Sequence, residues 1–522
     1  MHRGRTGNSG GAGAAPSGAA AHGASHGCTV TCDGPRLPAM PFEFALRHLD
    51  WGTLYVASEW TVRIAALVYV PQRRAPSAAR AWLLLIFFLP WLGVLLYLLI
   101  GRAYMPRRRF RVQKQIYELI RRIAPRAASF DATVDRAVSP ELMPALRLAD
   151  ALSEFPVVGG NRFTLLPEYD AAIDRVVAEV DGAQKYVHML FYIFEDDEVG
   201  KRVAGALERA ARRGVSVRVL MDAIGSRGGL KGLGPGLRAS GAEVVPVMPL
   251  RLWGPNAARF DLRNHRKIVV VDGTRAFFGS QNIVSAHANK GMVNEEMLVR
   301  TTGPIVRHLH AVLMGDRYLE LGTLPPESDD LSPAGPNLAQ DGLAQVVPSG
   351  PGYNEGTAEA VMIALMYGAR SRVVLTSPYV IPSEAFLAAM CSTARRGVAV
   401  DLIVDAESNK PMVQLAQQSY YDTMLRAGVA IHRHHESFLH AKHMSVDDDV
   451  ALIGSSNLDI RSFALNAEVS VLIYDRSVVA ALRHIQDGYL RHCDRVTVEE
   501  RRALRLGQRA LENLARLTDS LL

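Results

Sequence analysis

Cysteine is scarce in this chain of 522 residues, which contains only Cys28, Cys32, Cys391 and Cys493. Their spacing matches neither a zinc-binding set nor a dense disulfide framework, so we expect a reduced interior or no redox role. Lysine is also scarce, because only eight of the 59 basic residues are lysines and the others are arginines. A lysine inside a motif therefore stands where this chain otherwise prefers arginine.

Residues 1–39 lack both an apolar period and the hydrophobic segment of a secretory signal. Residues 1–27 are mostly Gly, Ala and Ser, which cannot bury enough surface to offset the entropy of ordering. We expect a disordered extension over 1–39, which is either a flexible tail or dispensable sequence upstream of a true start near Met40. The whole chain, with 48% hydrophobic residues, is not disordered, and its net charge of +7 favours an anionic partner.

A membrane anchor is predicted over residues 40–105. Residues 81–100 contain no charge and match the length needed to span about 30 Å of hydrocarbon, although a buried core helix is the alternative. Residues 54–70 carry Glu59 and Arg63, and form either a second span or a helix lying in the interface. The juxtamembrane linker, 106–156, is rich in arginine from its start, as in Arg107, Arg108 and Arg109. These charges predict contact with anionic headgroups and a cytoplasmic location for the rest of the chain.

The remaining chain repeats itself. The segment 211–223 (ARRGVSVRVLMDA) recurs at 394–406 as ARRGVAVDLIVDA, and an apolar strand precedes each copy. A strand, helix and strand that occur twice predict two homologous α/β sandwich domains with buried sheets. We place the first domain at 157–322, a Pro-, Asp- and Ser-rich linker at 323–342 and the second domain at 343–495. A helical tail is expected over 496–522.

Each domain carries the same motif, H-x-K-x4-D, followed by G-S-x-N. The six matching positions are displaced by 175 residues between the copies. Because residues i and i+2 of a strand project from one face, the histidine and lysine of each copy point into a common space. The candidate catalytic residues are His265, Lys267, Asp272, His440, Lys442 and Asp447. The candidate substrate-binding residues are Ser280, Asn282, Ser455 and Asn457.

Two imidazoles, two ammonium groups and small polar donors suit a tetrahedral phosphoryl group, for which they supply a nucleophile and a proton donor. A zinc site is the alternative for paired histidines, but the motif would place an ammonium beside the metal. The sequence offers no carboxylate cluster to hold a metal, so we expect neither a metal nor another cofactor.

This duplicated motif resembles that of the phospholipase D superfamily over about residues 157–495. Within the superfamily, residues 40–522 are similar to the bacterial cardiolipin synthases of the phospholipase D type. The similar segments include 90–93 (PWLG), 264–273 (NHRKIVVVDG), 377–382 (SPYVIP), 438–442 (FLHAK) and 454–468 (GSSNLDIRSFALNAE). The chain departs from that family at 293–296 (VNEE), where a Trp-x-Asp element is common, and at 316–317, where Asp-Trp is usual.

The resemblance implies phosphatidyl transfer in two displacements through a phosphohistidine, with His265 as the nucleophile by analogy. A carboxylate about thirty residues downstream would orient the histidine of its own copy, which gives Glu468 for His440 and either Glu295 or Glu296 for His265. The motif aspartates, Asp272 and Asp447, would rather brace the local fold.

The implied substrate is phosphatidylglycerol in the bacterial inner membrane, with catalytic domains on the cytoplasmic side. The anchor and the basic run favour lipid over nucleic acid as the partner. A phospholipase D or phosphodiesterase hydrolase is the alternative activity, and an inactive membrane scaffold is a third possibility, which two intact motifs disfavour.

Overall fold

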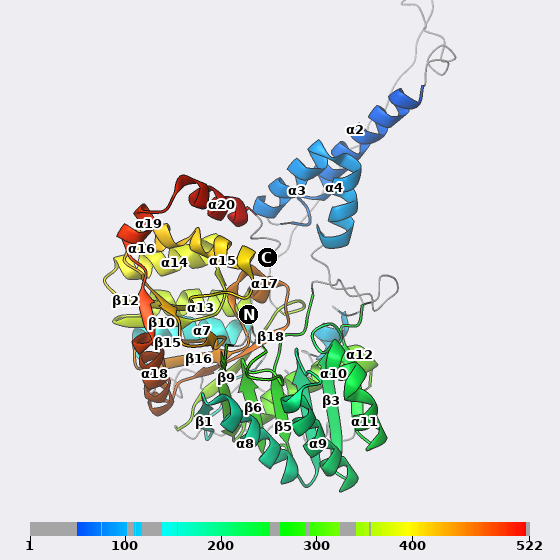
Figure 1. Cartoon of the computed structure of the whole chain (residues 1–522), viewed down its shortest axis with the longest axis vertical. Helices are drawn as coiled ribbons and strands as arrows, with labels where there is room; N and C mark the ends of the chain where they lie inside the picture. The colour runs from blue at the N-terminus through cyan, green and yellow to red at the C-terminus, as the bar shows by residue number, and fades with distance from the viewer. Residues whose placement is uncertain are drawn as a thin grey trace, which may run out of the picture. The chain divides into compact units, whose positions relative to one another are not determined.

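The computed structural model describes residues 50–74, 76–101, 109, 111–116, 138–153, 155–250, 262–288, 292–323, 341–353 and 356–517. The chain divides into a short unit, Met1–Thr61, and a large unit, Val62–Leu522, which contains two α/β domains. In Figure 1 the first domain runs from teal to green, and the second from yellow-green to red. The predicted α/β class with two homologous domains is confirmed, and the sheets of both domains are mixed.

The first domain is built on a seven-stranded sheet of order β1-β8-β6-β5-β2-β3-β4. The strands are β1 (Arg162–Leu166), β2 (Tyr186–Phe191), β3 (Ser216–Asp222), β4 (Glu243–Val247), β5 (Ile268–Val271), β6 (Arg275–Gly279) and β8 (Leu298–Thr302). Every residue of the central strands β2 and β5 is buried, as expected for strands covered on both faces. Helices α8 (Tyr169–Asp181), α9 (Glu198–Arg212), α10 (Arg227–Gly232), α11 (Gly234–Ala239) and α12 (Ile305–Leu321) complete the domain.

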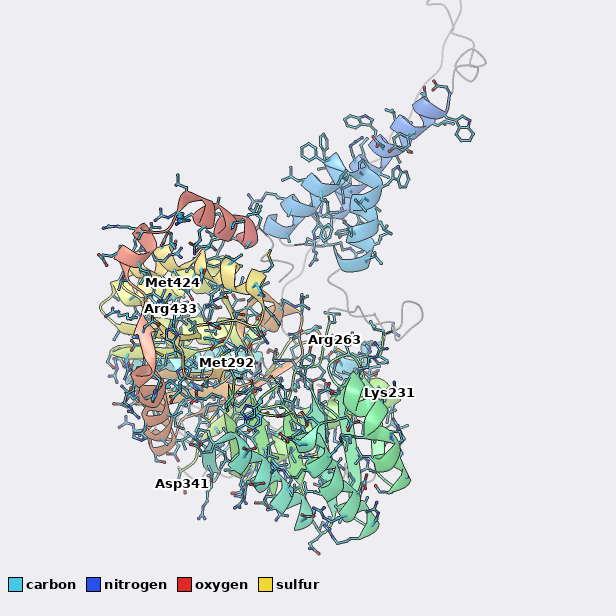
Figure 2. All side chains as sticks on the ribbon, viewed as in Figure 1. Lys231, Arg263, Met292, Asp341, Met424 and Arg433 are labelled. Carbon is cyan, nitrogen blue, oxygen red and sulfur yellow. The ribbon has the colours of Figure 1, made fainter. Side chains whose placement is uncertain are left out.

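The second domain has an eight-stranded sheet of order β19-β13-β12-β10-β15-β16-β18-β9. The strands are β9 (Ala344–Ser349), β10 (Arg372–Thr376), β12 (Ala399–Asp405), β13 (Ala430–His434), β15 (His443–Val446), β16 (Val450–Gly454), β18 (Glu468–Ile473) and β19 (Cys493–Arg495). Its helices are α13 (Thr357–Gly368), α14 (Glu384–Arg395), α15 (Pro411–Gln418), α16 (Tyr421–Ala427), α17 (Ile460–Ala464) and α18 (Arg476–Arg491). Side chains fill the space between the ribbons of both domains (Figure 2).

One apolar cluster joins the two domains. It contains Leu190 and Ile268 from the first sheet together with Ile453 and Val471 from the second. Helix α12 packs against β5 of its own sheet and against β9 of the second, while α18 packs against both β16 and β1. A continuous core of this kind fixes the domains as one body, so residues of the two motifs keep a defined geometry.

Short backbone pairings also cross between the domains. The two-residue strand β7 (Asn294–Glu295) of the first domain pairs in parallel with β14 (Phe438–Leu439) of the second. In the reciprocal position, Asn264 of the first domain forms a parallel bridge with Ala467 of the second. Each crossing therefore ends directly before a motif histidine, His440 or His265.

The apolar N-terminal stretch forms several helices. Helix α2 (Trp51–Tyr69) precedes α3 (Pro76–Phe88), α4 (Pro90–Leu96) and a π-helical turn, Tyr97–Gly101. A Cβ atom on Gly93 would lie 2.8 Å from the Cα of Ile86, so the chain folds back at Leu89. The predicted span over 81–100 is thus divided between α3 and α4, because Pro90 cannot continue the hydrogen bonds of α3. Within the residues described, no helix is both long enough and apolar enough to span a bilayer.

Part of the predicted linker 106–156 is folded. Helix α7 (Met143–Leu152) packs on α13, and its residues Leu146 and Ala149 are fully buried in the core of the second domain. Arg109, predicted to face lipid headgroups, is 2% exposed and pairs with Glu320 of α12. Arg107 and Arg108 lie outside the described residues, as do residues 1–39 and most of the predicted interdomain linker.

The expected C-terminal helical tail contains α19 (Val498–Arg502) and α20 (Leu506–Arg516). Arg501 joins the two helices, because its guanidinium forms a buried ion pair with Glu512 at 2.6 Å. Helix α20 packs on α15. Its outward face exposes Leu506, Leu511 and Leu514.

Candidate active site

Both motif histidines are positioned by backbone hydrogen bonds from the other domain. The N–H of His265 donates to the carbonyl oxygen of Ala467 at 2.9 Å, and the N–H of His440 donates to that of Glu295 at 2.8 Å. These contacts continue the interdomain pairings described above, so each H-x-K segment enters its own strand, β5 or β15, while held by the opposite domain.

The aspartates that end β3 and β12 act at equivalent places in the two copies. The Asp222 carboxylate accepts the N–H of Asn264 at 3.1 Å, and the Asp405 carboxylate accepts the N–H of Leu439 at 3.2 Å. Each accepted N–H belongs to the residue before a motif histidine. The repeat 211–223 and 394–406 contains both aspartates at the same position, which is the sequence signal that could have identified them.

The carboxylates that orient the histidines are exchanged between the domains. The Nδ1 of His265 lies 3.0 Å from Glu468, and the Nδ1 of His440 lies 2.7 Å from Oε1 of Glu296. The expectation that each carboxylate serves the histidine of its own copy is therefore wrong. The interdomain backbone pairings explain the exchange, because they bring Ala467–Glu468 beside His265 and Glu295–Glu296 beside His440.

Glu295, the other candidate for orienting a motif histidine, contacts His434 and Ser437 instead. Its carboxylate lies 2.9 Å from Nε2 of His434 and accepts the hydroxyl of Ser437. Adjacent residues of an extended segment point to opposite sides, so only Glu296 can reach His440.

The serines of the G-S-x-N elements hold these carboxylates. The Ser280 hydroxyl donates to Glu296 and the Ser455 hydroxyl donates to Glu468, each at 2.5 Å. Both serines are fully buried. Their predicted contact with the phosphate is therefore not supported, since each hydroxyl proton is already used to fix a carboxylate.

The two asparagines lie in the same turns. Asn282 accepts the N–H of Ile193 through Oδ1 at 3.2 Å, which leaves its NH₂ group pointing away from that contact. Asn457 is 7% exposed, and its Oδ1 is buried without a hydrogen-bond partner. Each side chain retains an NH₂ group, which is a donor of the kind that binds phosphoryl oxygens.

Burial weakens the basicity of both motif lysines. It lowers the pKa of Lys267 to about 7 and that of Lys442 to about 8, although Glu468 and Glu296 act in the opposite direction. Each ammonium donates to the backbone oxygen of its motif histidine, from Lys267 to His265 at 2.6 Å and from Lys442 to His440. An anionic ligand would restore the usual preference of these lysines for the charged form.

The histidines are held neutral. Burial, together with the nearby charges of Lys267 and Lys442, lowers the pKa of His265 well below its ordinary value. Burial lowers the pKa of His440 to about 4, with Glu296 opposing the shift. A neutral imidazole that donates from Nδ1 to a carboxylate leaves the lone pair of Nε2 available.

The two orienting carboxylates differ. Burial raises the pKa of Glu468 to about 7 despite the nearby Lys267. Burial acts in the same direction on Glu296, but His440, Lys442 and the Ser280 hydroxyl outweigh it, so the pKa of Glu296 lies below its usual value. The pair His440–Glu296 therefore contains the firmly ionised carboxylate.

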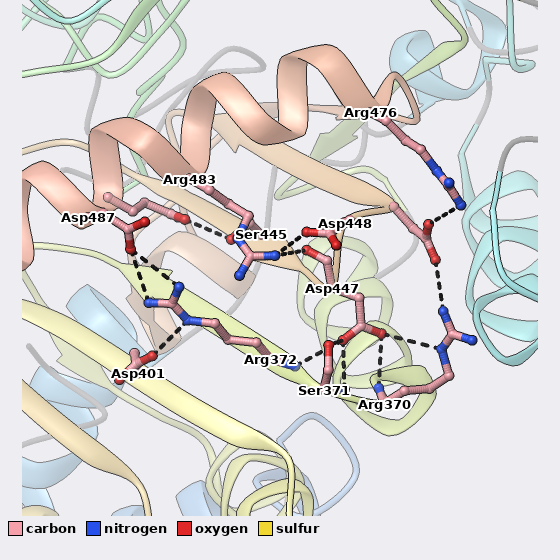
Figure 3. A network of polar contacts seen from close by, with 12 residues as sticks. Arg370, Ser371, Arg372, Asp401, Ser445, Asp447, Asp448, Arg476, Arg483 and Asp487 are labelled. Carbon is pink, nitrogen blue, oxygen red and sulfur yellow. Dashed lines mark hydrogen bonds and ion pairs between the residues drawn. The ribbon is translucent and has the colours of Figure 1, made fainter.

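The motif aspartates lie at the opposite end of β5 and β15 from the histidines. Asp272 accepts the N–H groups of Gln184, Lys185 and Tyr186. Figure 3 shows the equivalent role of Asp447, which accepts the N–H groups of residues 370, 371 and 372 at the start of β10. A catalytic role for Asp272 and Asp447 is therefore not supported; they brace the fold.

Several residues that surround the motif residues were not identified from the sequence. The Tyr192 ring lies 4.9 Å from the His265 ring and 5.5 Å from Nζ of Lys267. Buried Arg266 donates to the carbonyl oxygen of Glu468 at 2.9 Å and forms an ion pair with Asp316 at 2.6 Å. Asp316 keeps the aspartate of the usual Asp-Trp pair, and only Arg317 departs from it, but no local pattern indicates the contact of Asp316 with Arg266.

Metal ligands do not converge at this site. Across the described parts of the chain, no three His, Cys, Asp or Glu side chains form a group that could hold a metal ion. The absence of a metal and of other cofactors stays a prediction.

Comparison with known proteins identifies the family of this chain. A family model described as "Cardiolipin synthase, PLD-like domain" matches residues 176–315 and 362–488, and one described as phospholipase D-nuclease N-terminal matches 62–102. Cardiolipin synthase A of Yersinia pseudotuberculosis serotype O:1b (strain IP 31758) is 33% identical over 427 residues, which cover 80% of this chain and 87% of that protein. The same values apply to cardiolipin synthase A of Yersinia pestis.

A solved structure also has this fold. Phosphatidylserine synthase of Haemophilus influenzae Rd KW20 aligns with a TM-score of 0.53 and 16% identity, covering 72% of this chain and 97% of that one. Two α/β domains with a duplicated H-x-K motif at their junction define the phospholipase D class of phosphatidyltransferases. Within that class, the chain belongs to the cardiolipin synthase family.

Proposed function

We propose that this enzyme joins two phosphatidylglycerol molecules into cardiolipin and releases glycerol. The observation that carries the proposal is the exchanged His–Glu geometry, in which two neutral imidazoles beside two lysines are each fixed through Nδ1. That arrangement supplies one nucleophile and one proton carrier without a metal.

In the first displacement, Nε2 of His265 attacks the phosphorus of the donor. The bond from phosphorus to the glycerol oxygen breaks, and this oxygen takes a proton from the His440 side chain. In the enzyme without substrate, the pKa of His440 is lowered to about 4, so its imidazole is not protonated at neutral pH. His440 must therefore gain its proton as the anionic substrate binds. Ionised Glu296 stabilises the imidazolium that results.

In the second displacement, the now neutral His440 accepts the proton of a hydroxyl group on the acceptor. The acceptor oxygen bonds to phosphorus, the bond from phosphorus to His265 breaks, and cardiolipin leaves. Lys267, Lys442 and the amides of Asn282 and Asn457 are assigned to the non-bridging phosphoryl oxygens, where developing negative charge needs donors.

The same proposal includes association with the bacterial inner membrane. Helices α2 to α4 expose large apolar side chains, such as Ile64, Leu84 and Phe88, and α20 exposes a row of leucines. A helix with one apolar face and flanking arginines is suited to an interface with anionic lipids. The basic run after the apolar stretch supports a cytoplasmic location of the catalytic domains.

The test is incubation of the full chain in vesicles with labelled phosphatidylglycerol, followed by lipid separation. We expect cardiolipin and free glycerol in equal amounts from the wild type. His265→Ala and His440→Ala should each lose turnover while the protein remains folded by circular dichroism. Phosphatidic acid as the only product would indicate a hydrolase and refute the transferase assignment.

A further inference from the structure

A third lysine, Lys410, lies at the edge of the candidate site. It ends the loop between β12 and α15, where its N–H donates to the hydroxyl oxygen of Ser408 at 3.1 Å. Its Nζ lies 4.6 Å from the centre of the Tyr379 ring. Tyr379 is 6% exposed and donates its hydroxyl to Oδ1 of Asn409 at 2.5 Å. The loop and the buried ring thus hold the ammonium in a defined place.

Backbone pairing brings Tyr379 beside the second motif, because β11 (Val380–Ile381), which follows Tyr379, pairs in parallel with β17 (Leu458–Asp459), which follows Asn457. Lys410 contributes to the lowering of the pKa of His265 and of Lys442, after burial and nearer groups. Glu296, the partner of His440, contributes to a raised pKa of Tyr379. The cluster of Tyr379, Asn409 and Lys410 therefore lies within electrostatic reach of the reacting groups.

The equivalent position of the first domain has different surroundings. The repeat that aligns Asp222 with Asp405 aligns Lys410 with Arg227, which is exposed at the start of α10, whereas Lys410 lies against the buried Tyr379 ring. The loop before Arg227 is held by the Ser226 hydroxyl, which donates to the carbonyl oxygen of Tyr192 at 2.8 Å. The two halves of the site thus place their loop cations differently, although they share the motif.

We propose that Lys410, supported by Tyr379, binds the phosphodiester of the acceptor lipid. This inference rests on the proposed function. The transferred phosphorus lies among Lys267, Lys442 and the asparagines, whereas an acceptor phosphatidylglycerol brings a second anionic phosphodiester, separated from its attacking hydroxyl by a three-carbon glycerol. A cation outside the motifs, held against Tyr379 beside the turn that contains Asn457, meets this need. Water and free glycerol make no use of it.

The experiment compares two acceptors for the same phosphatidyl-enzyme. Full-length protein in phosphatidylglycerol vesicles is assayed for cardiolipin formation and, in parallel, for incorporation of labelled glycerol into phosphatidylglycerol. Glycerol has no phosphodiester, so the ratio of the two rates isolates the acceptor phosphate. The variants are Lys410→Gln and Lys410→Arg, with Lys201→Gln as the control. Lys201 is an exposed lysine of α9 that pairs with Asp196 at 3.6 Å.

Loss of a charged hydrogen-bond donor should lower the ratio of cardiolipin formation to glycerol incorporation in Lys410→Gln by about tenfold or more. Lys410→Arg should recover most of the ratio, and Lys201→Gln should match the wild type. Equal loss of both reactions in Lys410→Gln would overturn the inference, because it would mean that Lys410 acts only on the motif groups. An unchanged ratio would overturn it as well.

Inorganic phosphate distinguishes a lipid site from a site for free anions. If phosphate inhibits the wild type but not Lys410→Gln, while the acceptor ratio is the same in both, Lys410 binds a free anion and the inference is wrong. Failure of the proposed function looks different, because the wild type itself would then form no cardiolipin.

Discussion

The exchanged carboxylates can be tested by pairing each glutamate with the histidine that it contacts. The perturbations are Glu468→Gln and Glu296→Gln, which keep the side-chain volume but remove the negative charge. Each glutamate contacts a histidine of the other domain, at 3.0 Å for His265 and 2.7 Å for His440. Glu468→Gln should therefore resemble His265→Ala in its kinetic behaviour, and Glu296→Gln should resemble His440→Ala.

The size of the effect follows from the buried hydrogen bonds. Both carboxylates are at most 2% exposed, and each also accepts a serine hydroxyl. A hydrogen bond to a charged group contributes about 1.5–3 kcal/mol, so its loss in the transition state should slow turnover by about 10- to 150-fold. Glu296→Gln should fall near the upper end, because the pKa values indicate that Glu296 is the more firmly ionised of the two.

A phosphodiester with a p-nitrophenyl leaving group separates the two classes of variant. Such a leaving group departs without a proton, so the first turnover needs the nucleophile but not the general acid. In rapid-mixing measurements of p-nitrophenolate release, the rate of the first turnover should return toward the wild-type rate in His440→Ala and Glu296→Gln. It should stay low in His265→Ala and Glu468→Gln. If Glu468→Gln recovered together with His440→Ala, each glutamate would serve its own copy and the exchange would be refuted.

Three further predictions concern pH, metals and the membrane. The value of kcat/KM should fall as pH rises through about 7 to 8, because Lys267 and Lys442 lose their protons there. Bound substrate favours the charged lysines, so the corresponding fall in kcat should lie at higher pH. A kcat/KM profile with no fall below pH 9 would contradict the lysine assignment. EDTA should leave the rate of cardiolipin formation unchanged, since lysines and amides are assigned the electrophilic role; a loss restored by added zinc would contradict it. Leu511→Glu combined with Leu514→Glu should weaken flotation with phosphatidylglycerol vesicles, because both leucines are more than half exposed on α20, whereas Gln508→Glu is the control on the same helix.

Local patterns were sufficient to predict the two domains and the residues that meet at their junction. The duplicated motif and the repeated strand–helix–strand segments are short-range features, and the α/β class follows from them. His265, Lys267, His440 and Lys442 lie where the motif spacing indicates, although their catalytic roles stay predictions.

The partners of those residues depend on contacts between distant segments. Choosing Glu468 for His265 required the backbone pairing of Asn264 with Ala467, which no local pattern encodes. The serines were assigned to the phosphate because small hydroxyls suit oxyanions, but their protons are used by the glutamates. The break in the apolar stretch had a local signal in Pro90, which hydrophobic length outweighed in the sequence interpretation.

The reciprocal pairing of histidines and glutamates also restricts how the two halves can change. If the chain were cut within residues 324–340, each fragment would carry a histidine whose carboxylate is on the other fragment. Neither fragment could supply a complete His–Glu pair, so activity could return only through reassociation. For the same reason, a gene copy that lost one half would lose both pairs at once, and divergence of either domain must preserve a residue that serves its neighbour.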